Sequence, residues 1–429
     1  MKSSSVVPEA GNKARVLDTD VMSEASPLRN RRFVVFAVGN GINNIGEAMY
    51  ATALPLLAYR LTGSLGIMTA LAAAVPLAML LAPSLGSVAD RWGSRVLVVP
   101  GLLLQAASAL VMNLLLQSGA ASTASLCICT LLVAVGAAAY RTGWMTGVPR
   151  MFPDTPVRAR GMLNSLFFAT TLIGPVLVAG CLPFMGYSGL LWLNLATFFA
   201  PIAVWLAGVH PPRVSRVNRG KGHNWKLSQG WRAIVEDRRI FGMLIVQLVI
   251  GITCGAGLTT LVVFSLTHTW QQSDGTASVA LTVMNASMLV GNLMVTQIKR
   301  LRPWVALSFG MAVRTASLLL LSVPSWPVFL VALALGGIGQ GAVLSTVVMM
   351  RVKYLPEAVL GRASGLMWLI TGAAALLSPV IAPLLTDAGG TRGAFLVLGL
   401  ATSLGLWHLL RSRADWAQGS GPASPASGR

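Results

Sequence analysis

Long apolar segments separated by short polar loops occupy almost the whole chain. Each segment has at least about 18 residues, which is long enough to cross the hydrocarbon core of a bilayer as a helix. The twelve segments lie at 33–59, 65–88, 96–117, 122–148, 162–184, 188–208, 240–266, 276–298, 304–322, 326–350, 363–385 and 391–411. The pattern predicts an all-α polytopic membrane protein with twelve transmembrane helices.

Composition agrees with this pattern. Hydrophobic residues make up 55% of the chain and charged residues 10%, whereas soluble domains carry about 25% charged residues. A net charge of +19 would suggest nucleic acid as the partner of a soluble protein. Here the basic residues gather in the tails and in every second loop, and the other loops hold only Arg60 and Arg392. This asymmetry predicts a cell-membrane protein with both termini in the cytoplasm and no nucleic-acid partner.

A long polar segment divides the spans into six and six. It opens with Pro211 and Pro212 and continues as a basic linker that ends in an amphipathic pattern over Leu227–Ile240, which predicts a helix lying along the inner membrane surface. We therefore expect a disordered tail, a first six-helix bundle, a cytoplasmic linker, a second six-helix bundle and a second cytoplasmic tail. These regions are 1–32, 33–208, 209–239, 240–411 and 412–429.

The two halves repeat one another in the same orientation. The step from Gly161 to Pro175 equals the step from Gly365 to Pro379, and similar polar residues precede both glycines. Parallel repeats of this kind predict two bundles related by an axis along the membrane normal.

Glu47 is the strongest candidate for chemistry inside the membrane, where a charge costs roughly 2.5–3.5 kcal/mol. Asn40, Asn43, Asn44 and Glu47 recur at steps of three and four residues and form one polar stripe on the first helix. We expect this stripe to line a cavity, with Glu47 taking up and releasing a proton. A fixed ion pair with Arg141 is the alternative.

Two arginines also lie within predicted spans. Arg141, in the fourth helix, could pair with Glu47, contact an anionic substrate, reach Asp90 or extend to the inner interface. Arg314, in the ninth, has no acid near it in sequence and needs a partner from elsewhere, such as a backbone carbonyl. In the second half, Asn285, Asn292 and Gln340 are candidate cavity residues because unpaired amides are costly in lipid. Trp144 is a candidate for the apolar wall.

No catalytic or nucleotide-binding pattern occurs. The sequence lacks a phosphate-binding G-x-x-x-x-G-K-[ST] loop and any clustered catalytic residues. We therefore expect no enzymatic activity, no metal and no cofactor, and we expect a proton gradient as the energy source.

Ten residues between the second and third segments form the most specific motif. Gly86, Asp90, Arg91, Gly93 and Arg95 give the pattern G-x-x-x-D-R-x-G-x-R in what we expect to be a tight, solvent-side turn. This pattern resembles the signature loop of the major facilitator superfamily of secondary transporters. The chain as a whole looks most like the twelve-helix bacterial drug and siderophore exporters.

The resemblance implies roles for particular residues. Asp90 would hold the two halves together at the cytoplasmic side, with Arg91 and Arg95 in the same gating network. The corresponding loop at Lys299–Trp304 lacks both the acid and the glycines. Gly174 and Pro175 are similar to the Gly-Pro motif in the fifth helix of proton-driven exporters, and proline there would kink the helix.

These observations favour a secondary transporter that exports small, largely apolar compounds, such as antibiotics or metabolites, in exchange for protons. An importer or facilitator of a small organic anion is the alternative, with Arg141 and Arg314 binding its charge. A receptor or scaffold without transport is a more remote one. We expect a monomer whose partners are the bilayer and a small-molecule substrate.

Overall fold

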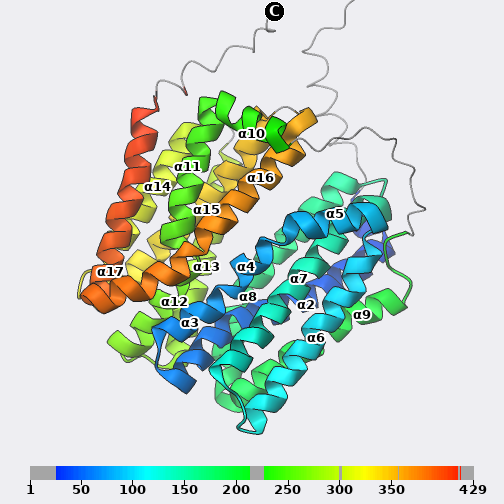
Figure 1. The fold of residues 1–429 in the computed structure, drawn as a ribbon, viewed down its shortest axis with the longest axis horizontal. Coiled ribbons are helices and arrows are strands. Elements are labelled where there is room, and N and C mark those ends of the chain that lie inside the picture. Colours follow the sequence, from blue (N-terminus) through cyan, green and yellow to red (C-terminus); the bar gives the residue numbers. More distant parts are fainter. Residues whose placement is uncertain (1–25, 213–226, 299–301, 356, 414–415, 417–429) are drawn as a thin grey trace, which may run out of the picture.

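The computed structural model describes residues 26–212, 227–298, 302–355, 357–413 and 416. Three regions lie outside this part of the chain: most of both predicted tails, much of the basic linker and the loop residues Lys299–Leu301. So do the side chains of several helical residues, among them Asp90. The described chain forms helices arranged as two bundles (Figure 1).

The first bundle precedes the linker. Its elements are η1 (Pro27–Arg29), α2 (Arg31–Thr62), α3 (Leu65–Ala72), α4 (Ala74–Met79), α5 (Ala82–Trp92), α6 (Arg95–Gln117), α7 (Thr123–Met151), α8 (Pro156–Thr197) and α9 (Phe199–Leu206). The second bundle follows the linker. Its elements are α10 (Leu227–Glu236), α11 (Arg238–Cys254), α12 (Ala256–Phe264), η2 (Ser265–Thr269), α13 (Asp274–Gln297), α14 (Pro303–Leu321), α15 (Trp326–Tyr354), α16 (Glu357–Ala375) and α17 (Leu377–Arg411).

The polytopic all-α fold is confirmed. Within the described residues, 9 helices are long and apolar enough to cross a membrane. Two of them, Arg158–Leu206 and Ala363–Arg411, have 49 residues each, and a straight helix of that length would measure about 74 Å. Each is interrupted by a left-handed glycine, Gly186 at φ 62° and Gly390 at φ 68°. Each therefore makes two passes, and together with α2 the helices are consistent with twelve passes.

Two local expectations differ from the structure. The motif Gly86–Arg95 is helical as far as Trp92, and only Gly93, at φ 88°, and Ser94 separate α5 from α6. The helix expected over Leu227–Ile240 ends at Glu236, because Asp237 adopts an extended conformation and caps α11 by accepting a hydrogen bond from the backbone N–H of Arg239.

Asp237 lies outside the membrane-spanning segments. Partial burial opposes its ionisation, but hydrogen bonds and the charge of Arg239 hold the pKa of this carboxyl below its usual value. The N-terminal cap of α11 is therefore ionised at neutral pH.

Glycines allow equivalent helices of the two bundles to approach closely. A Cβ atom on Gly101 of α6 would lie 2.8 Å from the carbonyl oxygen of Gly136 on α7. A Cβ on Gly310 of α14 would lie 3.1 Å from the carbonyl oxygen of Gly339 on α15. The internal repeat is thus visible in packing as well as in sequence.

The bundles contact each other through α8 and α13, and again at the end of the molecule opposite to the start of α2 and the end of α17, which we call the opposite face. There α3 lies beside α12 and α17 (Figure 1, lower left). One buried apolar cluster joins residues of both halves, with Leu57 and Leu65 from the first and Leu258 and Phe264 from the second. Burial of this apolar surface holds the two bundles together at the opposite face.

Candidate functional site

Glu47 lies midway along α2 and is held by two partners. Asn43, one turn earlier, donates from its amide nitrogen to Oε1 at 2.9 Å. Arg141 on α7 places Nη2 at 3.5 Å from Oε2, and its guanidinium lies over the ring of Phe167 on α8, 4.1 Å from the ring centroid. The side chains of Arg141 and Glu47 remain 40% and 20% exposed. The sequence alternative of an ion pair between them is therefore present in the structure.

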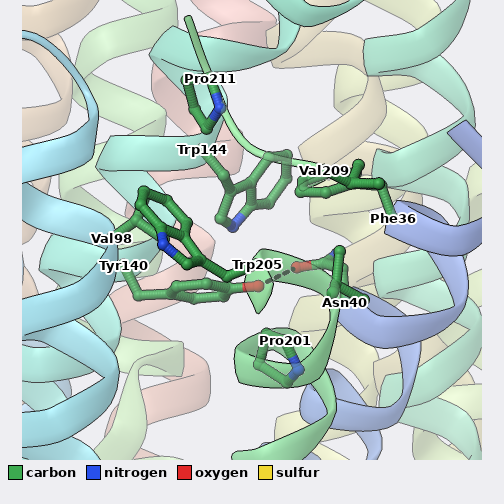
Figure 2. A pocket seen from close by; sticks show the side chains of 10 residues that line it. Phe36, Asn40, Val98, Tyr140, Trp144, Pro201, Trp205, Val209 and Pro211 are labelled. Atoms are coloured by element: carbon green, nitrogen blue, oxygen red, sulfur yellow. Dashed lines mark hydrogen bonds between the residues drawn. The ribbon is translucent and has the colours of Figure 1, made fainter. Parts of the chain in front are cut away.

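Asn40 faces a different group of residues. Tyr140 donates its hydroxyl to Oδ1 of Asn40 at 3.1 Å, and Trp144 lies beside them (Figure 2). These side chains line a cavity of about 20 Å³ together with Phe36 and Trp205, which is the size of about one water molecule. Trp144 is buried in the first bundle, so it forms no wall of the larger cavity described below.

Of the polar stripe of α2, Asn40 lines the small cavity of about 20 Å³, and none of its residues lines the larger cavity described below. Asn40, Asn43 and Asn44 are all buried, at 4% exposure or less. The reason is that the first helix packs on several neighbours: Gly46 lies against Asn194 and Thr197 of α8, on another side of α2 from Glu47. Glu47 is the residue of the stripe whose side chain stays partly exposed, at 20%.

A larger cavity, of about 160 Å³, lies among α8, α13 and α15. Asn285 and Asn292 both line it, as the sequence predicted for the second half. Asn285 donates to the backbone carbonyl oxygen of Thr171 in the first bundle at 3.1 Å. Asn292 accepts from the hydroxyl of Ser345 at 2.6 Å. The remaining lining is mainly apolar.

Arg314 and Gln340 lie elsewhere. Arg314 is 5% exposed, and it donates to the backbone carbonyl oxygen of Gly336 at 2.8 Å and to Sγ of Cys254 at 3.1 Å. The backbone carbonyl suggested by the sequence is therefore one of its partners. Neither Arg314 nor Gln340 lines the larger cavity, and the side-chain oxygen of Gln340 is buried.

The signature motif is only partly described. The side chain of Asp90 lies outside the described part of the chain, so its proposed gating role stays a prediction. Arg95 contacts the start of the linker: it donates to the carbonyl oxygen of Pro211 at 2.6 Å and pairs with Nδ1 of His210 at 2.7 Å. Arg91 lies over Trp92, with its guanidinium 5.7 Å from the ring centroid. Gly86 and Gly93 flank the last turns of α5.

The Gly-Pro motif packs α8 against α2. A Cβ on Gly174 would lie 2.5 Å from Cβ of Ala48, so this position requires glycine. The non-helical residue within α8 is Gly186, and the backbone at Pro175 remains helical. Gly174 provides close helix packing, and the main interruption of α8 occurs at Gly186, eleven residues after Pro175.

Sequence reasoning missed a polar cluster at the opposite face. Arg60 of α2 and Tyr187 of α8 both contact Oδ2 of Asp274 on α13, at 2.8 and 2.7 Å. One signal was available, because Arg60 is one of two basic residues in the loops of that side. The pairing itself requires knowledge of which loops meet.

Comparisons with known proteins agree with this architecture. A family model described as Major Facilitator Superfamily matches residues 36–324 and 266–427. Curated protein sequences give no match.

Among solved structures, a POT family transporter in complex with a thioalcohol-conjugated peptide has a TM-score of 0.71 and 13% identity, and the match covers 92% of this chain and 99% of that one. A bacterial homologue of the iron transporter ferroportin, in an inward-facing state, has a TM-score of 0.69 and 16% identity, with coverage of 90% and 98%. The nucleoside transporter NupG has a TM-score of 0.64 and 13% identity, with coverage of 89% and 98%.

At these identities the solved structures show the fold, whereas the family model extends over nearly the whole chain. The chain therefore belongs to the Major Facilitator Superfamily and is a multi-pass membrane transporter rather than an enzyme.

Proposed function

We propose that the chain exports small, largely apolar compounds in exchange for protons, with Glu47 as the proton-coupling carboxylate. The observation that carries the proposal is the pairing of Glu47 with Arg141 and Asn43 within the bundle, at a side chain that stays 20% exposed. No further cofactor is needed, because the proton gradient supplies the energy.

Proton exchange at Glu47 follows from the strength of its contacts. The closest distance to the guanidinium is 3.5 Å, and Arg141 has a second favourable contact with the ring of Phe167. Protonation of Glu47 would release the ion pair without leaving Arg141 unstabilised. If the two conformations of the transport cycle differ in this distance, they differ in proton affinity, and a proton gradient can bias them.

The class of substrate is inferred from the larger cavity. Its described lining is uncharged and combines methionine and aliphatic side chains with a few amide and hydroxyl groups. Methionine adapts to apolar surfaces of different shape. Such a lining suits an uncharged, largely apolar compound better than an organic anion, since Arg141 and Arg314 do not line this cavity.

The proposed direction, export, comes from the resemblance to drug and siderophore exporters, and the proposed orientation is compatible with it. With both termini in the cytoplasm, the opposite face would be external, and the apolar cluster packed there would close the bundles on the outer side. The major facilitator fold then exports by separating the bundles at the opposite face.

Transport in inverted membrane vesicles tests the proposal. A respiration-driven pH gradient should drive uptake of a small uncharged fluorescent dye such as 7-amino-4-methylcoumarin, and Glu47→Gln should reduce the gradient-driven rate at least about tenfold, equivalent to about 1.4 kcal/mol. Dye binding should be retained. Glu236→Gln is the matched control, because Glu236 is an exposed carboxylate on α10 and its replacement should leave the rate unchanged.

Two results would contradict the proposal. A wild-type transport rate in Glu47→Gln would show that Glu47 does not couple transport to protons. A dye transport rate that does not depend on the pH gradient would show that transport is not coupled to protons at all. Accumulation of a small carboxylate by whole cells at low external pH, without dye export, would favour the importer instead.

A further inference from the structure

The larger cavity lies at the junction of the two bundles. Thr171 of α8 belongs to the first bundle, whereas α13 and α15 belong to the second. Along α13 the cavity extends from Asn285, in the middle of the helix, to Thr296 in its last turn. Its volume of about 160 Å³ is similar to that of an engineered apolar cavity that holds benzene, about 150 Å³. A small ring therefore fits.

The polar groups of the cavity are placed on one wall. Asn285 and Asn292 are seven residues apart, so they lie on the same side of α13 and about 10 Å apart along its axis. Asn285 uses its amide nitrogen for the carbonyl of Thr171, and its Oδ1 is an acceptor. Asn292 uses its oxygen for Ser345, and its amide nitrogen is a donor. Between them the wall is formed by Met288 and Leu289.

We propose that this cavity is the substrate site, and that it binds an uncharged ring compound with a hydrogen-bond donor at one end and an acceptor at the other. The donor is bound by Oδ1 of Asn285 and the acceptor by Nδ2 of Asn292. The ring packs on Met288, Leu344 and Val348. The assignment of this ligand as transported substrate rests on the proposed function, whereas the binding site does not.

Charged ligands are disfavoured for a physical reason. The described lining has no charged side chain, so a carboxylate or ammonium would lose hydration without gaining an opposite charge. An uncharged hydroxyl or amide loses less hydration free energy on entering the cavity, and a hydrogen bond with an asparagine replaces one that it made with water.

The same asparagine links binding to the junction. The hydrogen bond from Asn285 to Thr171 joins the two bundles. Separation of α8 from α13 must break it, which leaves the amide nitrogen of Asn285 without its acceptor. A ligand hydroxyl at this end can act as acceptor for that nitrogen, so the bound ligand favours separation of the bundles at this point.

Equilibrium binding of 4-hydroxyacetanilide to the purified full-length protein in lipid nanodiscs tests the site. This probe carries a hydroxyl donor and an amide acceptor at opposite ends of a ring. Asn285→Leu and Asn292→Leu should each raise its Kd about three- to tenfold, the effect of losing one hydrogen bond. Thr282→Val is the matched control: Thr282 lies on α13 outside the lining and bonds its own helix, so its Kd should not change. The anion 4-hydroxybenzoate should bind at least about tenfold more weakly than the probe.

A second measurement does not depend on how the asparagine variants fold. Thr296 is exposed and lines the cavity. In a background without the four native cysteines, the cysteine in Thr296→Cys should therefore react with a maleimide, and saturating probe should slow that reaction several-fold. Four results would each overturn the site: no probe binding to the wild type at millimolar concentration, wild-type affinity for the probe in both asparagine variants, preference for the anion, or labelling unaffected by the probe. Probe binding without dye transport would instead support the binding site and contradict the proposed function.

Discussion

Nε of Arg60 lies 2.8 Å from Oδ2 of Asp274, and this ion pair joins the end of α2 in the first bundle to the start of α13 in the second. Tyr187 donates its hydroxyl to the same oxygen at 2.7 Å. Nearby, the hydroxyl of Tyr59 lies 3.2 Å from Nδ1 of His268. Asp274 is 7% exposed, so three chain segments converge on one buried carboxylate. The bundles can separate at the opposite face only if these contacts break.

Asp274→Asn should therefore favour separation at the opposite face. The amide keeps the shape of the carboxylate but loses its charge, and hydrogen bonds to charged groups contribute about 1.5–3 kcal/mol. Because the Arg60 side chain is 62% exposed, water reduces that value, and we expect the separated population to rise about three- to tenfold. Electron–electron double resonance between spin labels at Leu61 and Ser273, in a background without the four cysteines, measures this population.

Asp387→Asn is the control for this experiment, because Asp387 is an exposed acid near the turn at Gly390. Its distance distribution should match that of the parent. An unchanged distribution in Asp274→Asn would show that apolar packing alone seals this face.

The ion pair of Glu47 and Arg141 should behave as a coupled unit in stability. Arg141→Gln leaves a partly buried carboxylate without its cation, whereas Arg141→Gln combined with Glu47→Gln removes both charges. Removal of one partner of a buried pair costs up to about 3–5 kcal/mol, and removal of both is often close to neutral. We expect a reduced value here, because the two side chains are 40% and 20% exposed.

In detergent, the wild type should therefore have the highest Tm, the double variant an intermediate Tm and Arg141→Gln the lowest. The double variant should recover at least half of the loss in Tm. Additive losses would show that Arg141 contributes through Phe167 and not through Glu47.

Hydropathy was sufficient for the fold because the bilayer leaves few alternatives. A backbone in lipid must satisfy its own hydrogen bonds, so apolar segments of sufficient length become helices. The same pattern also places the breaks within the two longest helices. Gly186 and Gly390 lie in the expected connections 185–187 and 386–390, although hydropathy does not show that the chain stays helical on both sides of a single left-handed glycine.

The candidate site was predicted less completely, for a different reason. Periodicity places Asn40, Asn44 and Glu47 on one side of α2, but it cannot say which neighbour each side chain meets. Asn40 contacts Tyr140 and Glu47 contacts Arg141, although both partners come from adjacent positions of one helix. Contacts such as Arg60 with Asp274, 214 residues apart, depend on how the bundles dock and leave no local pattern.

Gly174 provides a packing prediction with an internal control. A Cβ at this position would lie 2.5 Å from Cβ and 2.6 Å from the carbonyl carbon of Ala48, whereas a Cβ on Gly180 would meet nothing within 4 Å. Gly174→Ala should therefore destabilise the first bundle by about 1–3 kcal/mol through overpacking. Gly180→Ala should be neutral or slightly stabilising, because alanine favours helix.

Thermal unfolding of the two variants in the same detergent measures the difference. Equal Tm values would mean that α2 and α8 can move apart at Ala48 without cost. In that case the motif has no strict packing role in this chain.

Arg314 distinguishes a structural charge from a substrate-binding one. It is 5% exposed, joins α14 to α15 through the carbonyl of Gly336 and to α11 through Cys254, and does not line the larger cavity. Arg314→Lys should lose at least one of these contacts while it keeps a buried charge, at a cost of about 1.5–3 kcal/mol. Arg314→Leu removes the charge as well, and it should be no less stable than Arg314→Lys, because an uncharged side chain avoids the cost of burial. Both variants should transport dye at the wild-type rate once rates are normalised to folded protein. If instead both keep the wild-type Tm and lose transport, Arg314 acts on the substrate, and the importer of an organic anion becomes the better account of this chain.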